Sequence, residues 1–180
     1  MKAGHLEILG ETIAKFKFFE NGYNPYSRYL DVDKVDLILR KRTGKVIKYI
    51  EVQVKYGRLY QCQPKWQLDK FDYTSWRTFN PDEFAEADDN LLIACILAHP
   101  TSSYSEGGYK GDIFIFKTQE WLEIMRSAIK INTKKGKRVS VYFAHSFKDD
   151  RWYLWKKFGF LAINLEATLD ITNFRRRFDF

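Results

Sequence analysis

The sequence predicts one mixed domain, α/β or α+β, in which a mixed sheet is flanked by helices and followed by a C-terminal elaboration. Three observations lead to this fold class. The chain of 180 residues has the length of a single domain. Its residues are 45% hydrophobic and 17% aromatic, enough to build a sizeable core. Segments with the helical and the strand period follow one another in the order helix, three strands, an unassigned region, two strands, helix, and one or two strands.

The first third of the chain predicts a helix followed by a β-hairpin. Apolar residues recur every three or four positions between Leu6 and Glu20, and Asn21-Gly22 is a typical helix stop. The segment NPYS, at 24–27, predicts a turn. The segments SRYLDVD and KVDLILRK predict one bent strand or two successive strands. Arg42–Lys45 contains the glycine of the predicted hairpin turn, and VIKYIEVQVKY follows as the returning strand.

The sequence predicts elements for most of the rest of the chain but leaves one region unassigned. Residues 57–90 mix aromatic, charged and proline residues, and no element is assigned to them. The segments at 91–98 and 112–117 predict strands, with a loop rich in serine and glycine between them. A helix is predicted at 118–131, with Thr118 as its N-cap. After a basic turn, VSVYFAH and RWYLWKKF predict the last strands.

Composition narrows the class of protein. The formal net charge of +7 favours a polyanionic partner, with nucleic acid first. Cys62 and Cys95 lack the spacing of a zinc site, and so few cysteines favour a reducing, cytoplasmic setting. The N-terminus has no apolar region typical of a signal peptide, and the longest apolar run is too short to span a bilayer, so no membrane association is expected. The three histidines are far apart and are interpreted as ordinary packing or surface residues.

The returning strand of the predicted hairpin has one apolar and one polar face. Its polar face carries Glu51, Gln53 and Lys55. Counting across the turn places Asp36 opposite the segment from Glu51 to Gln53, with Cβ atoms about 5 Å apart. Asp31 and Asp33 are rivals to Asp36, but they precede the apolar run and are interpreted as strand-edge or turn residues. Glu11, in the first helix, can supply a further carboxylate if that helix lies across the hairpin.

These side chains form a set suited to phosphodiester hydrolysis. Carboxylate and amide oxygens are preferred ligands of Mg²⁺. A bound cation polarises a phosphoryl oxygen and lowers the pKa of a bound water, and a lysine stabilises the charge that develops on the phosphate. The alternative is a solvated strand face with ordinary surface charge pairs.

The pattern resembles the PD-(D/E)XK nuclease superfamily, in the QVK form similar to intron-encoded homing endonucleases. The matching residues are Glu11 in GETIAKF, Asp36 in KVDLIL, and Gln53 and Lys55 in VQVKYG. The resemblance covers residues 5–57, and the remaining strands and helix fall within 91–155. It implies a single restriction-endonuclease-like domain over 1–180, with an αβββαβ core and Mg²⁺-dependent DNA cleavage. Asp36, Glu11 and Gln53 would then hold the cation, and Lys55 would support the transition state.

The sequence departs from the family pattern at two positions. Val35 stands where the pattern has proline, and Gln53 stands where it has an acid, which removes one negative charge from the expected metal site. A second alignment takes Glu51 as the acid and Gln53 in the place of the lysine. We prefer Gln53 with Lys55 because lysine supplies the positive charge directly, and we keep Glu51 as a reserve ligand.

Three basic segments are predicted to contact DNA. Arg58 and Lys65 follow the candidate catalytic strand, a basic turn contains four cationic residues, and the C-terminal segment contains three consecutive arginines. The turn residues are Lys134, Lys135, Lys137 and Arg138, and the arginines are Arg175, Arg176 and Arg177. The alternative for each segment is a solvated surface or packing against another part of the protein.

The sequence therefore predicts a Mg²⁺-dependent endonuclease acting on double-stranded DNA. Because each chain carries one such centre, cutting both strands favours a homodimer or a higher symmetric oligomer. Two alternatives stay open. One is a four-way junction resolvase with the same chemistry, and the other is a nucleic-acid-binding protein of the same fold that does not cleave.

Overall fold

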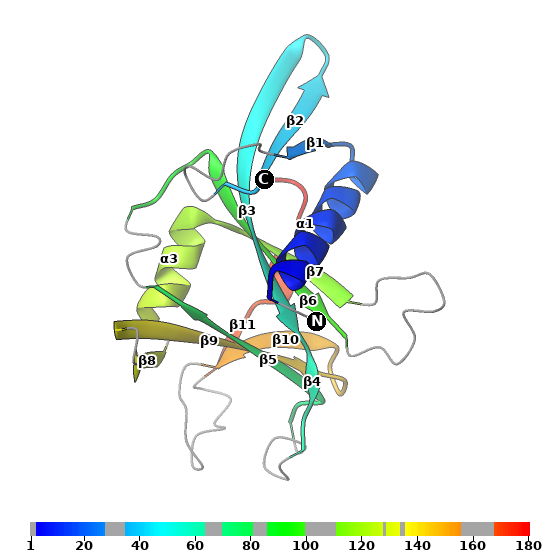
Figure 1. Cartoon of the computed structure of the whole chain (residues 1–180). Helices are drawn as coiled ribbons and strands as arrows, with labels where there is room; N and C mark the ends of the chain where they lie inside the picture. Colours follow the sequence, from blue (N-terminus) through cyan, green and yellow to red (C-terminus); the bar gives the residue numbers. More distant parts are fainter. Residues whose placement is uncertain are drawn as a thin grey trace.

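The computed structural model describes residues 3–27, 35–63, 70–80, 86–99, 111–127, 129–133, 136–155 and 168–180. Within these ranges the protein is mixed α/β, with strands in two sheets and helices packed beside them (Figure 1). None of the helices in these ranges is both long enough and apolar enough to cross a membrane.

The first sheet contains the predicted hairpin. Its strand order is β1-β2-β3-β6-β7, and β3 pairs with β6 in parallel while the other neighbours are antiparallel. The elements are α1 (Ala3–Glu20), β1 (Asn24–Ser27), β2 (Leu37–Thr43), β3 (Val46–Arg58), β6 (Leu91–Ala98) and β7 (Gly111–Lys117). The helix α1 packs across β3, with smaller contacts to its neighbours.

The second sheet has the order β11-β10-β9-β5-β4, and β8 also pairs with β9. Its strands are β4 (Tyr60–Gln61), β5 (Tyr73–Phe79), β8 (Ile129–Thr133), β9 (Gly136–Ser146), β10 (Arg151–Trp155) and β11 (Thr168–Asp170). The helix α3 (Thr118–Ser127) follows β7, and the short 3-10 helix η4 (Thr172–Phe174) follows β11.

Alternating side chains of the first sheet build two separate cores. Ile50, Val52 and Tyr56 of β3 face α1, where they pack with Ile13 and Phe18. The opposite face of the sheet carries the odd-numbered residues of β6, which pack with α3 and with strands of the second sheet. In the parallel register, Gln53 lies beside Ile93 and Lys55 beside Cys95. The polar residues of β3 therefore lie on the same face of the sheet as the odd-numbered residues of β6. The polar face of β3 is therefore turned toward the second sheet.

Most predicted elements in the described ranges are confirmed, including α1, the hairpin turn and the strands β3, β6, β7, β9 and β10. Gly44 has φ +61°, which suits the tight turn between β2 and β3. The prediction of a turn at 24–27 is wrong, since these residues form the edge strand β1. Pro25 is tolerated there because an edge strand leaves one row of amides unpaired. Residues 28–34, with Asp31 and Asp33, and the loop at 100–110 lie outside the described residues.

The predicted helix at 118–131 is too long. It ends at Ser127, and Ile129 begins β8, which pairs with β9. The β-branched residues of this segment are better accommodated in a strand than in a helix. Thr118 does not cap the helix. Its hydroxyl donates to the carbonyl of Asp88 at 2.6 Å and accepts from the Asp88 amide at 2.8 Å, so it ties the helix start to the segment before β6.

Candidate active site

Asp36 lies at the edge of β3, immediately before β2 begins. The register pairs Leu37 with Val52, so its continuation places Asp36 beside Gln53, at one end of the segment from Glu51 to Gln53 that the sequence predicted. The Asp36 amide donates to the Val52 carbonyl at 2.9 Å, and its Oδ2 accepts from the Val54 amide at 2.5 Å. β3 runs on to Arg58, well past the start of β2. The Asp36 carboxylate is therefore held against the first part of this strand that β2 leaves uncovered.

Gln53 is buried on the face of β3 that is turned toward the second sheet. Only 4% of its surface is exposed. A fully solvated polar face, which was the alternative interpretation of this strand, does not describe this residue. Buried amides are almost always hydrogen-bonded, so an interior glutamine in a strand has a defined polar environment.

Lys55 and Glu51 flank Gln53 on the same face, and both are half-buried. The Lys55 Nζ lies 6.0 Å from the ring centroid of Phe79, at the edge of the range for a cation–π contact. The Glu51 backbone amide donates to the Asn90 carbonyl at 2.9 Å, and Glu51 lies beside Ile38 in the register with β2. Lys55 thus lies further along β3, toward the end that β2 does not cover, and Glu51 lies toward the hairpin.

Glu11 approaches from the other face of the sheet. Its helix is packed closely on β3, because a Cβ built on Gly10 would come within 2.7 Å of the Tyr56 Cβ. Tyr56 belongs to the apolar face of β3, opposite to Gln53 and Lys55. The pairing of strands therefore brings Asp36, Gln53 and Lys55 together, but it does not by itself bring Glu11 to their face. The edge of β3 beyond Val52, which β2 leaves uncovered, is where side chains from the two faces would have to meet.

The candidate ligands fit a hard cation by their chemistry. Asp36, Glu11 and Gln53 all offer oxygen donors, as Mg²⁺ requires. Over the described part of the chain, no group of three or more histidine, cysteine or acidic residues is placed to hold a metal ion. A cation at this site would therefore depend on two carboxylates and one neutral amide oxygen.

Arg58 is the last residue of β3 and lines a small cavity at this end of the strand. The cavity has a volume of about 230 Å³ and is lined by Leu6, Tyr56, Gly57, Arg58, Tyr60, Trp76 and Arg77. The rings of Tyr60 and Trp76 have centroids 5.2 Å apart, and both side chains are about half exposed. Guanidinium groups beside exposed aromatic rings suit a phosphate together with a base.

The structure describes only some of the other residues that were predicted to contact DNA. Lys137 is exposed and Arg138 is half-buried at the start of β9. Lys65, Lys134 and Lys135 lie outside the described residues. No element was predicted from the sequence around Trp76 and Arg77, so their place in the cavity was missed.

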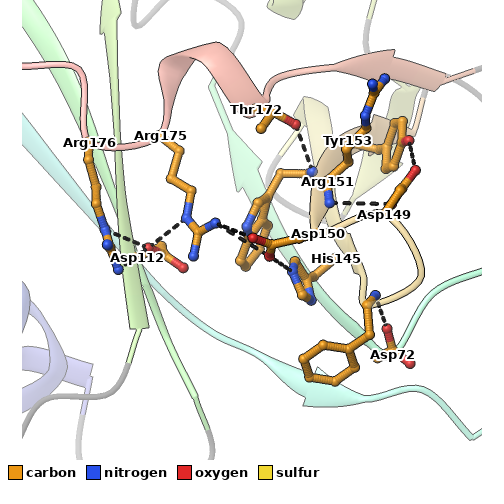
Figure 2. Close-up of polar contacts among 12 residues, drawn as sticks. Asp72, Asp112, His145, Asp149, Asp150, Arg151, Tyr153, Thr172, Arg175 and Arg176 are labelled. Carbon is orange, nitrogen blue, oxygen red and sulfur yellow. Dashed lines mark hydrogen bonds and ion pairs between the residues drawn. The ribbon is translucent and has the colours of Figure 1, made fainter.

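The three consecutive arginines make ion pairs within the protein. Arg175 and Arg176 both contact Asp112, at 2.9 and 3.0 Å, as Figure 2 shows. Arg177 binds both carboxylate oxygens of Glu120, at 2.8 and 2.6 Å. These pairs hold the C-terminal segment against β7 and α3. Contact between these arginines and DNA stays a prediction, and it would compete with ion pairs that already exist.

The charges around this C-terminal segment influence each other. Partial burial opposes ionisation of Glu120, but the hydrogen bonds from Arg177 and from the Lys117 amide outweigh it and lower the pKa of Glu120. The hydrogen bond to Asp112 raises the pKa of Arg175. Arg175 also reaches Asp150 at 3.5 Å, and Asp150 contacts the buried His145 at 3.1 Å (Figure 2). His145 therefore belongs to a structural network, in agreement with its interpretation as a packing residue.

Both cysteines are buried free thiols. Burial raises the pKa of Cys95 to about 12 and, with the nearby charge of Asp72, that of Cys62 to about 11. Thiols with such raised pKa values are unreactive at neutral pH.

We compared the chain with protein-family models, with curated proteins and with solved structures, and none of them matches.

Proposed function

We propose that this protein is a Mg²⁺-dependent DNA endonuclease of the PD-(D/E)XK type. The observation that carries the proposal is the Asp36 carboxylate, which is bonded to the Val54 amide and lies in register beside the buried Gln53. Lys55 is two residues further along the same face. An acid at the edge of one strand, with a polar ligand and a lysine on the next, is the arrangement that the family pattern describes.

The topology supports the proposal in part. A helix followed by three antiparallel strands, and then a strand parallel to the third, agrees with the first half of the expected core. The family pattern has a helix between the third and fourth core strands. Here the described residues between β3 and β6 instead include β4 and β5 of the second sheet. The proposed core is thus an elaborated form of the family pattern.

The side chains would divide the chemistry among them. Asp36 and Gln53, with Glu11 reaching round the uncovered edge, would hold the cation. When bound, Mg²⁺ would polarise a phosphoryl oxygen and lower the pKa of a water. Lys55 would stabilise the negative charge that develops on the phosphate. Glu51, one step back on the same face, would orient Lys55 or serve as a reserve ligand. A symmetric dimer or higher oligomer would supply the second centre for the other strand.

A second candidate function is nucleic-acid binding without cleavage. The observation that favours it is the small number of acids, since only two of the three proposed ligands are carboxylates. Replacing one carboxylate by an amide weakens the electrostatic attraction for a divalent cation. Such a protein would use the same fold and would keep the basic surface.

The test is a cleavage assay on several substrates. Purified protein is incubated with linear duplex DNA, supercoiled plasmid and a four-way junction, in Mg²⁺, Mn²⁺ or EDTA. The proposal predicts cleavage of duplex DNA with either cation and none in EDTA. Binding to all substrates with no product under any condition would favour the second candidate. Cleavage restricted to the junction would indicate a resolvase.

A further inference from the structure

The β2–β3 hairpin extends beyond the core as an arm, which we define as residues 40–49. The core ends at Leu39 and Ile50, which are paired and buried. Beyond them, the four consecutive residues from Val46 to Tyr49 are all exposed. Side chains alternate between the two faces of a strand, so consecutive exposure means that both faces of the arm meet solvent. Figure 1 shows this hairpin projecting away from the rest of the first sheet.

The arm carries most of the net charge of the protein. Its sequence is RKRTGKVIKY, with five basic residues and no acid. The whole chain has 30 basic and 23 acidic residues, so 25 basic and 23 acidic residues remain outside the arm, a net charge of +2. A local excess of this kind produces a strong positive potential, because no neighbouring carboxylate on the arm neutralises it.

The register makes this charge costly in the free protein. Lys41 and Lys48 are directly opposite each other in the ladder, and like charges at such positions are destabilising. Lys41 is held in place near the base of the arm, where its Nζ donates to the Tyr23 hydroxyl at 3.2 Å and lies 4.3 Å from the centroid of that ring. The arm contains no acid that could offset the repulsion between Lys48 and Lys41. A bound polyanion removes this repulsion.

The arm also exposes apolar side chains, which raises the alternative of a protein partner. Val46, Ile47 and Tyr49 have 69%, 39% and 58% of their surface exposed. A second copy of the arm would bring five positive charges against five, which disfavours self-association through this surface. The apolar side chains instead suit contacts with thymine methyl groups or sugars between the phosphate contacts.

The dimensions of the arm fit duplex DNA. The major groove is about 12 Å wide and admits a two-stranded β-ribbon. Arg40 and Arg42 lie on one face of the ribbon with Ile47 and Tyr49, because the register pairs Arg40 with Tyr49 and Arg42 with Ile47. Val46 lies seven positions before Gln53, which corresponds to about 23 Å along the strand, at roughly 3.3 Å per residue. That length spans about seven base pairs of B-DNA.

We infer that the β2–β3 arm enters the major groove of duplex DNA and anchors the substrate about seven base pairs or less from the bond that is cut. The position of the cut rests on the proposed nuclease function, whereas the groove contact does not. Arg42, Lys45 and Lys48, near the end of the arm, contact phosphates at the groove edges. Arg40 and Tyr49, nearer the core on the face that they share with Arg42, contact base edges. None of these residues lies among the candidate catalytic side chains.

The test compares two triple variants of equal charge. The arm variant is Arg42→Gln, Lys45→Gln and Lys48→Gln, and the control variant is Lys117→Gln, Arg126→Gln and Lys148→Gln, all at exposed positions outside the arm. Fluorescence anisotropy gives the affinity for a 30-base-pair duplex over a salt series. Each lost phosphate contact reduces the slope of log affinity against log salt by about 0.9, so the arm variant is expected to lose up to about 2.7 and the control less than one. Equal losses in both variants, or no loss in the arm variant, would overturn the inference.

Two further measurements separate the outcomes. An equal loss of affinity for single-stranded DNA of the same length would contradict groove binding, since a single strand has no major groove. Cleavage at low salt, measured over a range of DNA concentrations, separates the arm from the catalytic centre. The arm variant is expected to need more DNA to reach its half-maximal rate, while Asp36→Asn binds with wild-type affinity and loses cleavage. If the wild-type protein never cuts but the arm variant still loses duplex affinity, the proposed nuclease function fails and the arm inference stands.

Discussion

At the scale of single residues, the most specific hypothesis concerns which residues on the polar face of β3 take part in catalysis. Gln53 is buried while Lys55 and Glu51 are half-buried on either side of it. The two alignments of EVQVK with the family pattern assign different roles to the two charged residues. In one, Lys55 lies beside the scissile phosphate, and in the other, Glu51 is a metal ligand.

We expect Lys55→Ala to lose much more activity than Glu51→Ala. Removal of one preorganised group that stabilises transition-state charge typically costs about 10²–10³ in rate. Glu51 lies closer to the hairpin and further from the uncovered edge, so its loss should cost much less. Single-turnover rates at saturating Mg²⁺ and DNA measure the difference. The reverse order would support Glu51 as the ligand, and small equal losses would mean that this face has only a structural role.

A second residue-scale prediction concerns the ion pair between Arg177 and Glu120. The folded-state pKa of Glu120 is lowered below its ordinary value of 4.5. Its contribution to stability is therefore present above pH 4.5 and disappears as the pH falls through the lowered pKa. We expect Glu120→Gln to reduce the free energy of unfolding by about 1–2 kcal/mol at pH 7, allowing for partial exposure of the pair.

Urea unfolding across pH checks this. The difference between wild type and variant should shrink steadily below pH 4.5, with Glu123→Gln on the same helix as a control that changes little. A difference that stayed constant down to pH 2.5 would show that the ionised carboxylate is not the stabilising form.

At the scale of elements, the position of α1 on β3 depends on a glycine. A Cβ at Gly10 would lie 2.7 Å from the Tyr56 Cβ, whereas a Cβ at Gly4 on the same helix would meet nothing within 4 Å. We expect Gly10→Ala to destabilise the protein by about 1–3 kcal/mol through overpacking. Gly4→Ala should be neutral or stabilising by up to about 1 kcal/mol, because alanine favours helix.

Thermal or urea unfolding of the two variants gives the comparison. Because Glu11 follows Gly10 directly, Gly10→Ala should also slow cleavage if Glu11 has the metal-binding role proposed for it. A Gly10→Ala variant as stable as Gly4→Ala would contradict the close packing of α1 on Tyr56.

The elements that the sequence predicts well are those whose pattern is local. The helix from Leu6 has a regular apolar period, the turn at Gly44 has its glycine, and β6 is a continuous apolar run. β5 was not predicted because Trp76 is half-exposed and Ser75 is buried, the reverse of the usual pattern. Ser75 is buried because it packs against Gly57 of β3, a long-range contact that no local pattern contains.

In the candidate site, too, the local arrangement could be predicted from the sequence and the long-range contacts could not. Counting across a tight turn places Asp36 opposite the segment from Glu51 to Gln53, and the register of the structure selects Gln53 within that segment. The face from which Glu11 approaches could not be predicted, because it depends on which side of the sheet α1 covers. The three C-terminal arginines looked like a DNA-binding cluster, yet their ion pairs are with Asp112, Glu120 and Asp150, which are distant in sequence.

At the scale of the whole molecule, the proposed binding arm and the proposed catalytic edge lie on one strand. β3 contains both, since its first residues form the projecting arm and its later residues carry Gln53 and Lys55. The cavity at its far end adds Arg58 beside Tyr60 and Trp76. A single strand of thirteen residues thus connects the three surfaces that the proposed function requires.

The most direct test of the central claim is the cleavage rate of Asp36→Asn. Asparagine keeps an oxygen that can accept the Val54 amide but loses the negative charge that would bind the cation. Asp89→Asn, at an exposed acid near β6, serves as the control. We expect Asp36→Asn to bind duplex DNA with wild-type affinity and to cut it at least about 10²-fold more slowly in saturating Mg²⁺, while the control cuts normally. Cleavage by Asp36→Asn at a rate close to wild type would contradict the account.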